Sequence, residues 1–97
     1  MIMRCNIKGY NSALGSDKKR IRNTFKNELS LFDVRSTNVE YRSDDDIVSC
    51  FCTMNVPDTN PITVFYSARG LESSTQGAIR MLKHQLLILN KGKTKQD

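Results

Sequence analysis

The sequence predicts an α+β fold in which a four-stranded sheet carries two helices on one of its faces. Three observations lead to this prediction. Four segments alternate apolar and polar residues as strands do, two segments repeat apolar residues at helical spacing, and their order is β-α-β-β-β-α. Both helices must bury an apolar stripe, and the strands offer one strongly apolar face. Packing both helices on that face is therefore the most economical arrangement.

The opening third of the chain predicts one strand and one helix. We expect the strand at residues 2–8, where apolar and polar residues mostly alternate, and a turn at 9–12. The helix is expected at residues 17–32, with Ser16 or Asp17 as its cap. Its apolar residues recur at spacings of four, four and three and form one stripe, consisting of Ile21, Phe25, Leu29 and Phe32.

The middle of the chain predicts three consecutive strands. We expect them near residues 35–42, 48–56 and 62–68, and the second shows the cleanest period-two pattern in the chain. An acidic loop at 43–46 and a turn at 57–61 connect them. Because these connections are short, the three strands should form an antiparallel meander.

The second helix follows Gly70, which lets the chain leave the sheet and fold back across it. One of Ser73, Ser74 and Thr75 is expected to cap this helix. Its buried stripe is expected to consist of Ala78, Ile79, Leu82, Leu86 and Leu89.

Length and composition indicate a single small domain. The 97 residues, of which 38% are hydrophobic and 26% charged, suit one modest core. We expect residues 1–90 to form the domain and residues 91–97 to form a basic, flexible tail. No apolar run approaches the roughly 20 residues of a membrane span, and the first residues lack the long apolar region of a secretion signal. We therefore expect a cytoplasmic protein with no membrane partner.

The three cysteines indicate buried thiols. An odd number argues against a disulfide framework. Cys50 and Cys52 lie two apart in a predicted strand, so both should project from the same face. His84 is the only histidine and is far away in sequence, so we expect no metal and no cofactor.

An enzymatic function has little support in the sequence. Nucleophile, zinc-protease and phosphate-loop motifs are missing. The acidic run 44–46 lacks the remaining ligand positions of a calcium loop, and His84 has no evident partner for proton transfer. We expect no catalytic residues. A small enzyme that uses His84 with the acidic loop stays open as an alternative, and it would require a cleft containing both.

The charge distribution points to an anionic partner. Residues 1–30 carry a net charge of +5, residues 31–60 carry −4, and residues 61–97 carry +4. If both helices lie on one side of the sheet, their basic side chains form one surface suited to RNA phosphates. A solvated helix face without a partner is the alternative. The candidate RNA-binding residues are Lys18, Lys19, Arg20, Arg22, Lys26, Arg80, Lys83 and Lys91.

Phe51 and Phe65 point away from the apolar faces of their strands. If the two strands pair around the 57–61 turn, opposed residue numbers sum to about 118, and 51 and 65 sum to 116. The rings should then be near neighbours on the open face of the sheet. They could stack on unpaired bases, shield the sheet as an ordinary cross-strand pair, or form a dimer contact.

The arrangement resembles the short ribosome hibernation-promoting factors, which are also called ribosome-associated inhibitors. "NIKGYN" (6–11) resembles the opening strand of that family, and "YSARGLESSTQGAI" (66–79) resembles its passage from strand to helix. The matching positions of this passage are Ala68, Gly70, Ala78 and Ile79. The family usually has an aspartate and a tyrosine where this chain has Ser74 and Gln76.

The resemblance implies binding without catalysis. Members of the family occupy the decoding channel of the small ribosomal subunit, where they exclude messenger and transfer RNA and keep idle ribosomes intact. The implied partners are the small subunit and its ribosomal RNA. The implied contacts are Lys18, Lys19, Arg22 and Lys26 in the first helix, and Arg80, Lys83 and Lys91 in and after the second.

The resemblance also implies translation inhibition under stress, without the additional carboxy-terminal domain of long family members. The main alternative is a protein-interaction module with the same fold. Such a module would form a homodimer through Phe51 and Phe65, or would bind an acidic protein on its helices.

Overall fold

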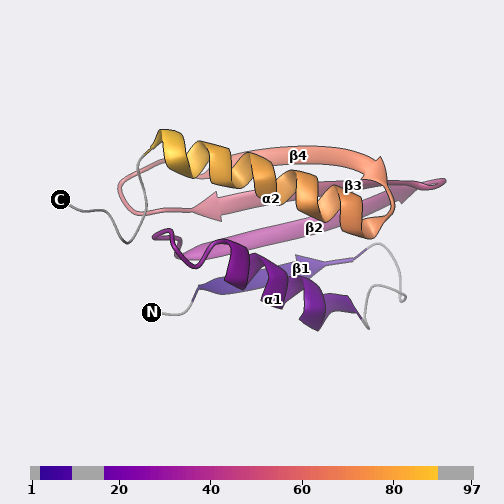
Figure 1. The fold of residues 1–97 in the computed structure, drawn as a ribbon, viewed down its shortest axis with the longest axis horizontal. Helices are drawn as coiled ribbons and strands as arrows, with labels where there is room; N and C mark the ends of the chain where they lie inside the picture. Colours follow the sequence, from indigo (N-terminus) through magenta and orange to yellow (C-terminus); the bar gives the residue numbers. More distant parts are fainter. Residues whose placement is uncertain (1–2, 10–16, 90–97) are drawn as a thin grey trace.

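The computed structural model describes residues 3–9 and 17–89 and confirms the predicted α+β class. Ser16, most of the expected turn at 9–12, and the expected tail with Lys91 lie outside the described residues. The elements in chain order are β1 (Arg4–Lys8), α1 (Lys18–Glu28), β2 (Ser36–Asp44), β3 (Ile47–Asn55), β4 (Ile62–Arg69) and α2 (Leu71–Ile88) (Figure 1).

The four strands form one sheet in the order β1-β2-β3-β4. β1 pairs parallel with β2, and the other pairs are antiparallel. This follows from the connections, since a parallel pair needs a crossover, here provided by α1, whereas short turns join antiparallel strands. The predicted meander of β2, β3 and β4 is thereby confirmed.

Both helices cover the same face of the sheet (Figure 1). Burial alternates along β1, β3 and the first six residues of β2, so that every second residue there is buried. Ile21 and Phe25 of α1 and Leu82 and Leu86 of α2 belong to the same core cluster as these strand residues. The opposite side of the sheet, which we call the open face, is covered by neither of the two described helices.

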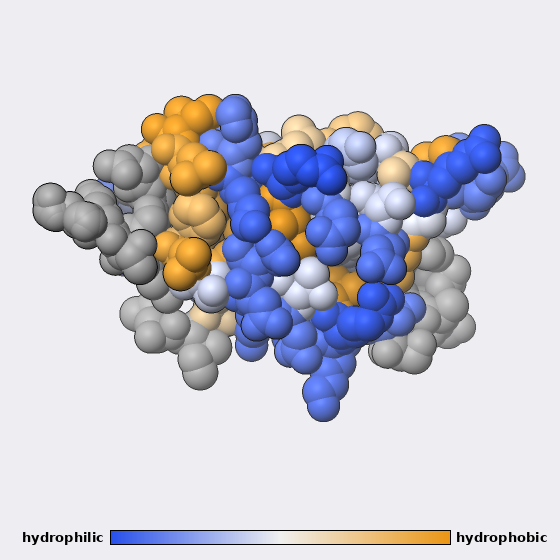
Figure 2. Space-filling model, viewed as in Figure 1, coloured by the Kyte–Doolittle hydropathy of each residue, from blue (hydrophilic) through white to orange (hydrophobic). Residues whose placement is uncertain are grey.

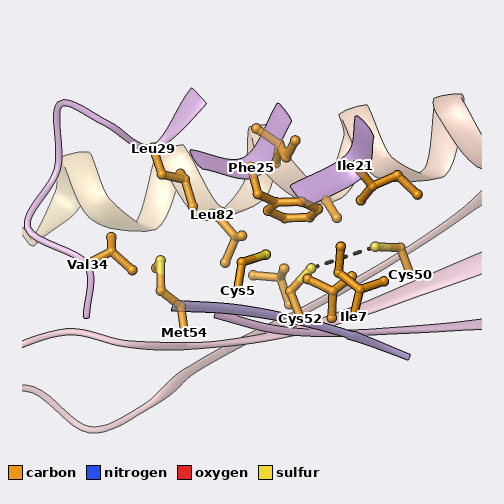
Figure 3. Close-up of a cluster of buried hydrophobic side chains, with 14 of the residues drawn as sticks. Cys5, Ile7, Ile21, Phe25, Leu29, Val34, Cys50, Cys52, Met54 and Leu82 are labelled. Atoms are coloured by element: carbon orange, nitrogen blue, oxygen red, sulfur yellow. Dashed lines mark hydrogen bonds between the residues drawn. The ribbon is translucent and has the colours of Figure 1, made fainter. Parts of the chain in front are cut away.

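The core lies between α1, α2 and the covered face of the sheet (Figure 3). Phe25, Met54 and Leu82 are completely buried, as are Cys50 and Cys52. Burying such side chains contributes roughly 1.5–3 kcal/mol each, which makes this layer the main source of stability.

α1 is shorter than predicted, because it ends at Glu28 and does not reach residue 32. The Leu29 amide still bonds to the Phe25 carbonyl, but the Phe32 amide bonds to Leu29 in a tighter turn. The chain reverses direction here to enter β2, and Leu31 is left exposed.

The predicted capping of α2 by Ser73, Ser74 or Thr75 is wrong. α2 begins directly after Gly70, whose φ of 88° is readily adopted only by glycine. Ser74 and Thr75 lie inside the helix, where their hydroxyls donate to the Leu71 carbonyl at 3.0 and 2.8 Å. Asp17 occupies the cap position of α1, but its side chain makes no capping bond.

Two further boundaries differ from the prediction. The acidic segment 43–46 is not a four-residue loop, because Ser43 and Asp44 pair with β3 and only Asp45 and Asp46 form the turn. Leu89, expected in the buried stripe, follows the end of α2 and is 38% exposed. Neither described helix is long and apolar enough to cross a membrane.

Candidate nucleic-acid interface

The outer side of α1 and α2 carries a basic surface, which we call the helical surface. Figure 2 shows hydrophilic side chains over much of this side, with hydrophobic ones gathered where α2 ends. The two helices and the cap position of α1 hold seven basic and three acidic residues, a net charge of +4. The basic residues are Lys18, Lys19, Arg20, Arg22, Lys26, Arg80 and Lys83, and the acidic ones are Asp17, Glu28 and Glu72.

Helical spacing positions the basic side chains of α1. Ile21 and Phe25 point into the core, so the residues between them face outward or flank the core. Lys18, Arg22 and Lys26 are spaced four apart and therefore form one row along the helix. All three are partly buried, whereas Lys19 and Arg20 are exposed.

Arg22 is held in place by the sheet. Its Nε donates to the Cys5 carbonyl of β1 at 3.2 Å. Burial raises the pKa of the Cys5 thiol, and the positive charges of Arg22 and Lys26 partly oppose this rise. The Arg22 guanidinium therefore has a fixed position at the border between α1 and β1, which favours a structural contribution alongside any phosphate contact.

Ion pairs occupy two of the predicted RNA-binding residues. Arg20 binds Asp17 within α1 at 3.0 Å, and Lys83 of α2 binds Glu28 of α1 at 2.6 Å. Among the described residues, no carboxylate pairs with the remaining lysines of α1 or with Arg80. The charges most available to an anionic partner are therefore Lys18, Lys19, Lys26 and Arg80.

The open face carries the predicted aromatic pair. Phe51 and Phe65 are directly opposed, because paired residues of β3 and β4 sum to 116 and not to 118. Their ring centroids lie 4.7 Å apart, and the Arg42 guanidinium lies 4.9 Å from the Phe51 centroid. Phe65 is 49% exposed. A cross-strand pair is therefore present, with one ring still available to a partner.

A shallow hollow of about 170 Å³ lies beside Phe51 on the open face. Asn6, Asn38 and Glu40 line it, and the Asn6 amide donates to the Asn38 side chain at 3.1 Å. Sequence reasoning missed this feature. In the sequence, these polar residues alternate with the core residues of β1 and β2. Only the pairing of the two strands shows that they lie next to each other.

The cysteines are free, buried thiols, as predicted. The sulfurs of Cys50 and Cys52 lie 3.7 Å apart on the covered face (Figure 3). The hydrogen bond to Cys50, together with burial, raises the pKa of Cys52. The same hydrogen bond lowers the pKa of Cys50, and burial opposes this change. Both side chains are completely buried and so out of reach of a substrate, which indicates that these residues contribute packing.

The structure does not bring His84 and the acidic turn together. Gly70, at the start of α2, bonds to the Asp46 carbonyl, whereas His84 lies fourteen residues further along the helix, or about 21 Å. His84 lines an open groove with Val64, Met81 and other residues that include no acidic side chain. The cleft required by the enzyme alternative is therefore not formed by these described residues.

Comparisons with known proteins agree with the fold. No protein-family model matches the chain, and no curated protein matches it in sequence. A ribosomal subunit interface protein from Coxiella burnetii has a similar structure, with a TM-score of 0.70 and 10% identity, over 91% of this chain and 98% of that one. The N-terminal domain of Thermus thermophilus Protein Y is similar with a TM-score of 0.73 and 13% identity, over 92% and 99%.

These likenesses cover nearly the whole of each chain. At 10 and 13% identity they establish a shared fold, and this fold is the one implied by the family resemblance in the sequence. Function has to be argued from the surface of this chain.

Proposed function

We propose that this protein is a cytoplasmic, ribosome-associated RNA-binding protein. In this proposal it docks on the small ribosomal subunit through the helical surface and contacts ribosomal RNA there. By occupying the decoding channel it excludes messenger and transfer RNA, and so inhibits translation and preserves idle ribosomes. The mechanism needs binding and steric exclusion, and no bond is made or broken.

The main support for the proposal is a group of basic side chains on the helical surface that form no ion pair with a described residue. Lys18, Lys19 and Lys26 of α1 and Arg80 of α2 have no carboxylate partner among the described residues. Neutralising phosphates with such side chains releases counterions, which favours binding to a polyanion. The likeness of the fold to a ribosomal subunit interface protein supports the ribosome as the polyanion.

The packing of the helices supports a rigid docking surface. Lys83 and Glu28 join α2 to α1, and Arg22 joins α1 to β1. Both helices also bury residues in one core. A surface fixed in this way loses little conformational freedom when it binds, and preorganisation of this kind increases affinity.

Co-sedimentation with purified small subunits tests the proposal. The variant Lys18→Glu, Lys19→Glu, Arg80→Glu reverses three unpaired charges and leaves the ion pairs and the Arg22 contact intact. We expect its affinity to fall at least about a hundredfold, and the dependence of affinity on salt to become correspondingly less steep.

The matched control is Lys18→Arg, Lys19→Arg, Arg80→Lys, which keeps every charge and should bind nearly as well as the wild type. Circular dichroism checks that both variants fold. Undiminished sedimentation of the charge-reversed protein would contradict the proposal, as would an affinity of the wild type that does not change with salt.

A protein-interaction module is the second candidate, and the exposed apolar residues favour it. Leu31, Leu87 and Ile88 are 62, 68 and 62% exposed, although side chains of this kind are usually buried. Mass measurement in solution, with and without RNA, separates the two candidates. A protein that self-associates and leaves ribosomes unbound would favour the second.

A further inference from the structure

The open face of the sheet combines three chemical features outside the helical surface. It carries a partly exposed aromatic pair, a hollow lined by amide and carboxylate groups, and four exposed basic side chains. We infer that this face binds unpaired bases of single-stranded RNA, with Phe65 as the stacking platform. The inference takes its class of ligand from the proposed function and adds a second contact surface.

The aromatic geometry leaves a platform for a base. The Phe51 ring lies between Phe65 at 4.7 Å and the Arg42 guanidinium at 4.9 Å. Phe65 belongs to β4, which is an edge strand of the described sheet, and this residue is 49% exposed. The two rings are tilted by 35°, so a base would stack on the exposed part of Phe65 itself, because nucleobases stack on aromatic rings.

The hollow beside Phe51 offers groups that hydrogen-bond to the edges of bases. Asn38 and Glu40 project from β2, and Asn6 projects from β1. Asparagine amides pair with adenine, and carboxylates accept hydrogen bonds from the amino group of cytosine. Lys8 also lines the hollow and can reach a phosphate of the same strand.

The charge of the open face favours an anion. By the strand register, this face carries four basic residues against two acidic ones, Glu40 and Asp44. The basic residues are Arg4, Lys8, Arg42 and Arg69, and all four are exposed. Arg42 pairs with Glu40 at 3.4 Å, so the phosphates of a strand that crosses the sheet would meet Arg4, Lys8 and Arg69 first.

A second copy of this chain fits the open face less well. Two facing copies would bring like charges together, which disfavours association. The large apolar side chains on this face are Phe51, Phe65 and Ile47, and the rest are mainly serine, threonine and asparagine. A stable interface buries about 800 Å² on each partner and has an apolar centre. Three apolar side chains are too few to form such a centre.

The test uses a single-stranded RNA hexamer with 2-aminopurine at its centre, whose fluorescence reports stacking. Phe65→Leu removes the ring and keeps an apolar side chain, and we expect it to bind about five- to a hundredfold more weakly. Phe65→Tyr restores the ring and should restore both affinity and stacking. Leu87→Ala, which truncates an exposed apolar residue of the helical layer, should bind as the wild type does.

The outcomes separate this inference from the proposed function. Retained stacking in the Lys18→Glu, Lys19→Glu, Arg80→Glu variant would support a second surface, whether or not that variant still binds ribosomes. If Phe65→Leu binds the hexamer as well as the wild type does, the inference is overturned. It is also overturned if the wild type binds ribosomes without stacking on the hexamer, or if Phe65→Leu instead abolishes self-association of the wild type.

Discussion

The two faces of the sheet use the same four strands for different purposes. On the covered face, β3 places Cys50, Cys52 and Met54 in complete burial beneath the helices. On the open face, the same strand places Ser49 and Thr53 opposite hydroxyl partners on β4 and sets Phe51 against Phe65. The comparison shows how strand alternation separates stability from recognition, because a substitution on one face need not disturb the other.

Two phenylalanines give the largest contrast between the faces. Phe25 of α1 is completely buried on the covered side, whereas Phe65 is half exposed on the open side. We expect Phe25→Ala to lower the free energy of unfolding by about 3–5 kcal/mol and Phe65→Ala to lower it by about 1 kcal/mol. Chemical denaturation measures both. Similar losses for the two variants would show that the open face also contributes to the core.

Gly77 tests how closely α2 packs on the covered face. A Cβ at this position would lie 2.2 Å from the Tyr66 ring of β4. We expect Gly77→Ala to destabilise the protein by about 1–3 kcal/mol through this clash, even though alanine favours a helix by about 1 kcal/mol. Gln76→Ala, at the exposed neighbouring position, is the matched control and should change stability little. If the Gly77→Ala protein is more stable than the wild type, α2 does not pack against Tyr66 as closely as the structure indicates.

High pH should lower the free energy of unfolding through groups buried on the covered face. Burial raises the pKa of Cys5 above the ordinary thiol value of 9.0, and the Cys50 hydrogen bond and burial raise that of Cys52. Burial also raises the pKa of Tyr41 above its ordinary value of 10.0. Because these groups stay neutral in the folded state but ionise when unfolded, their contribution is complete below pH 9 and is lost as the pH rises further.

Denaturation at pH 7, 9 and 10 measures this effect, and thiol-reagent labelling at pH 8 gives an independent check. We expect slow labelling of the folded protein and rapid labelling after unfolding. Stability that increases above pH 9, or rapid labelling of the folded protein, would contradict the burial of neutral thiols on the covered face.

The smallest effect concerns the ion pair that joins the two helices. Lys83 and Glu28 are 39% and 40% exposed, so water and salt screen their attraction. A double-mutant cycle with Lys83→Ala and Glu28→Ala should give a coupling energy below about 1 kcal/mol that decreases with salt. A coupling of several kcal/mol would indicate that this pair, and not the shared core, holds the helices side by side.

Alternation explains why the strands could be predicted from the sequence. Val48, Cys50, Cys52, Met54 and Val56 repeat with a period of two, and the structure buries all five. The same logic placed Phe51 and Phe65 together on the open face. The predicted sum of paired residue numbers was about 118, whereas the observed sum is 116. The difference arises because the length of a turn does not determine which of its residues stay unpaired.

The ends of the helices could not be predicted so well, because several neighbouring residues were equally suitable as caps. Ser74 and Thr75 resemble caps, yet their hydroxyls bond inside α2, and Thr75 also bonds to Tyr41 of β2. That contact spans 34 residues and exists only after the sheet has formed. The pairing of Lys83 with Glu28 spans 55 residues and was likewise beyond local reasoning.

Site-directed photo-crosslinking on small ribosomal subunits tests the central claim most directly. A benzophenone side chain would replace Lys19 on the helical surface or, as a control, Asp58 in the exposed turn between β3 and β4. We expect the probe at position 19 to crosslink to RNA of the small subunit, and the probe at position 58 to crosslink much less. RNA crosslinks from position 58 alone, or only protein crosslinks from position 19, would contradict docking through the two helices.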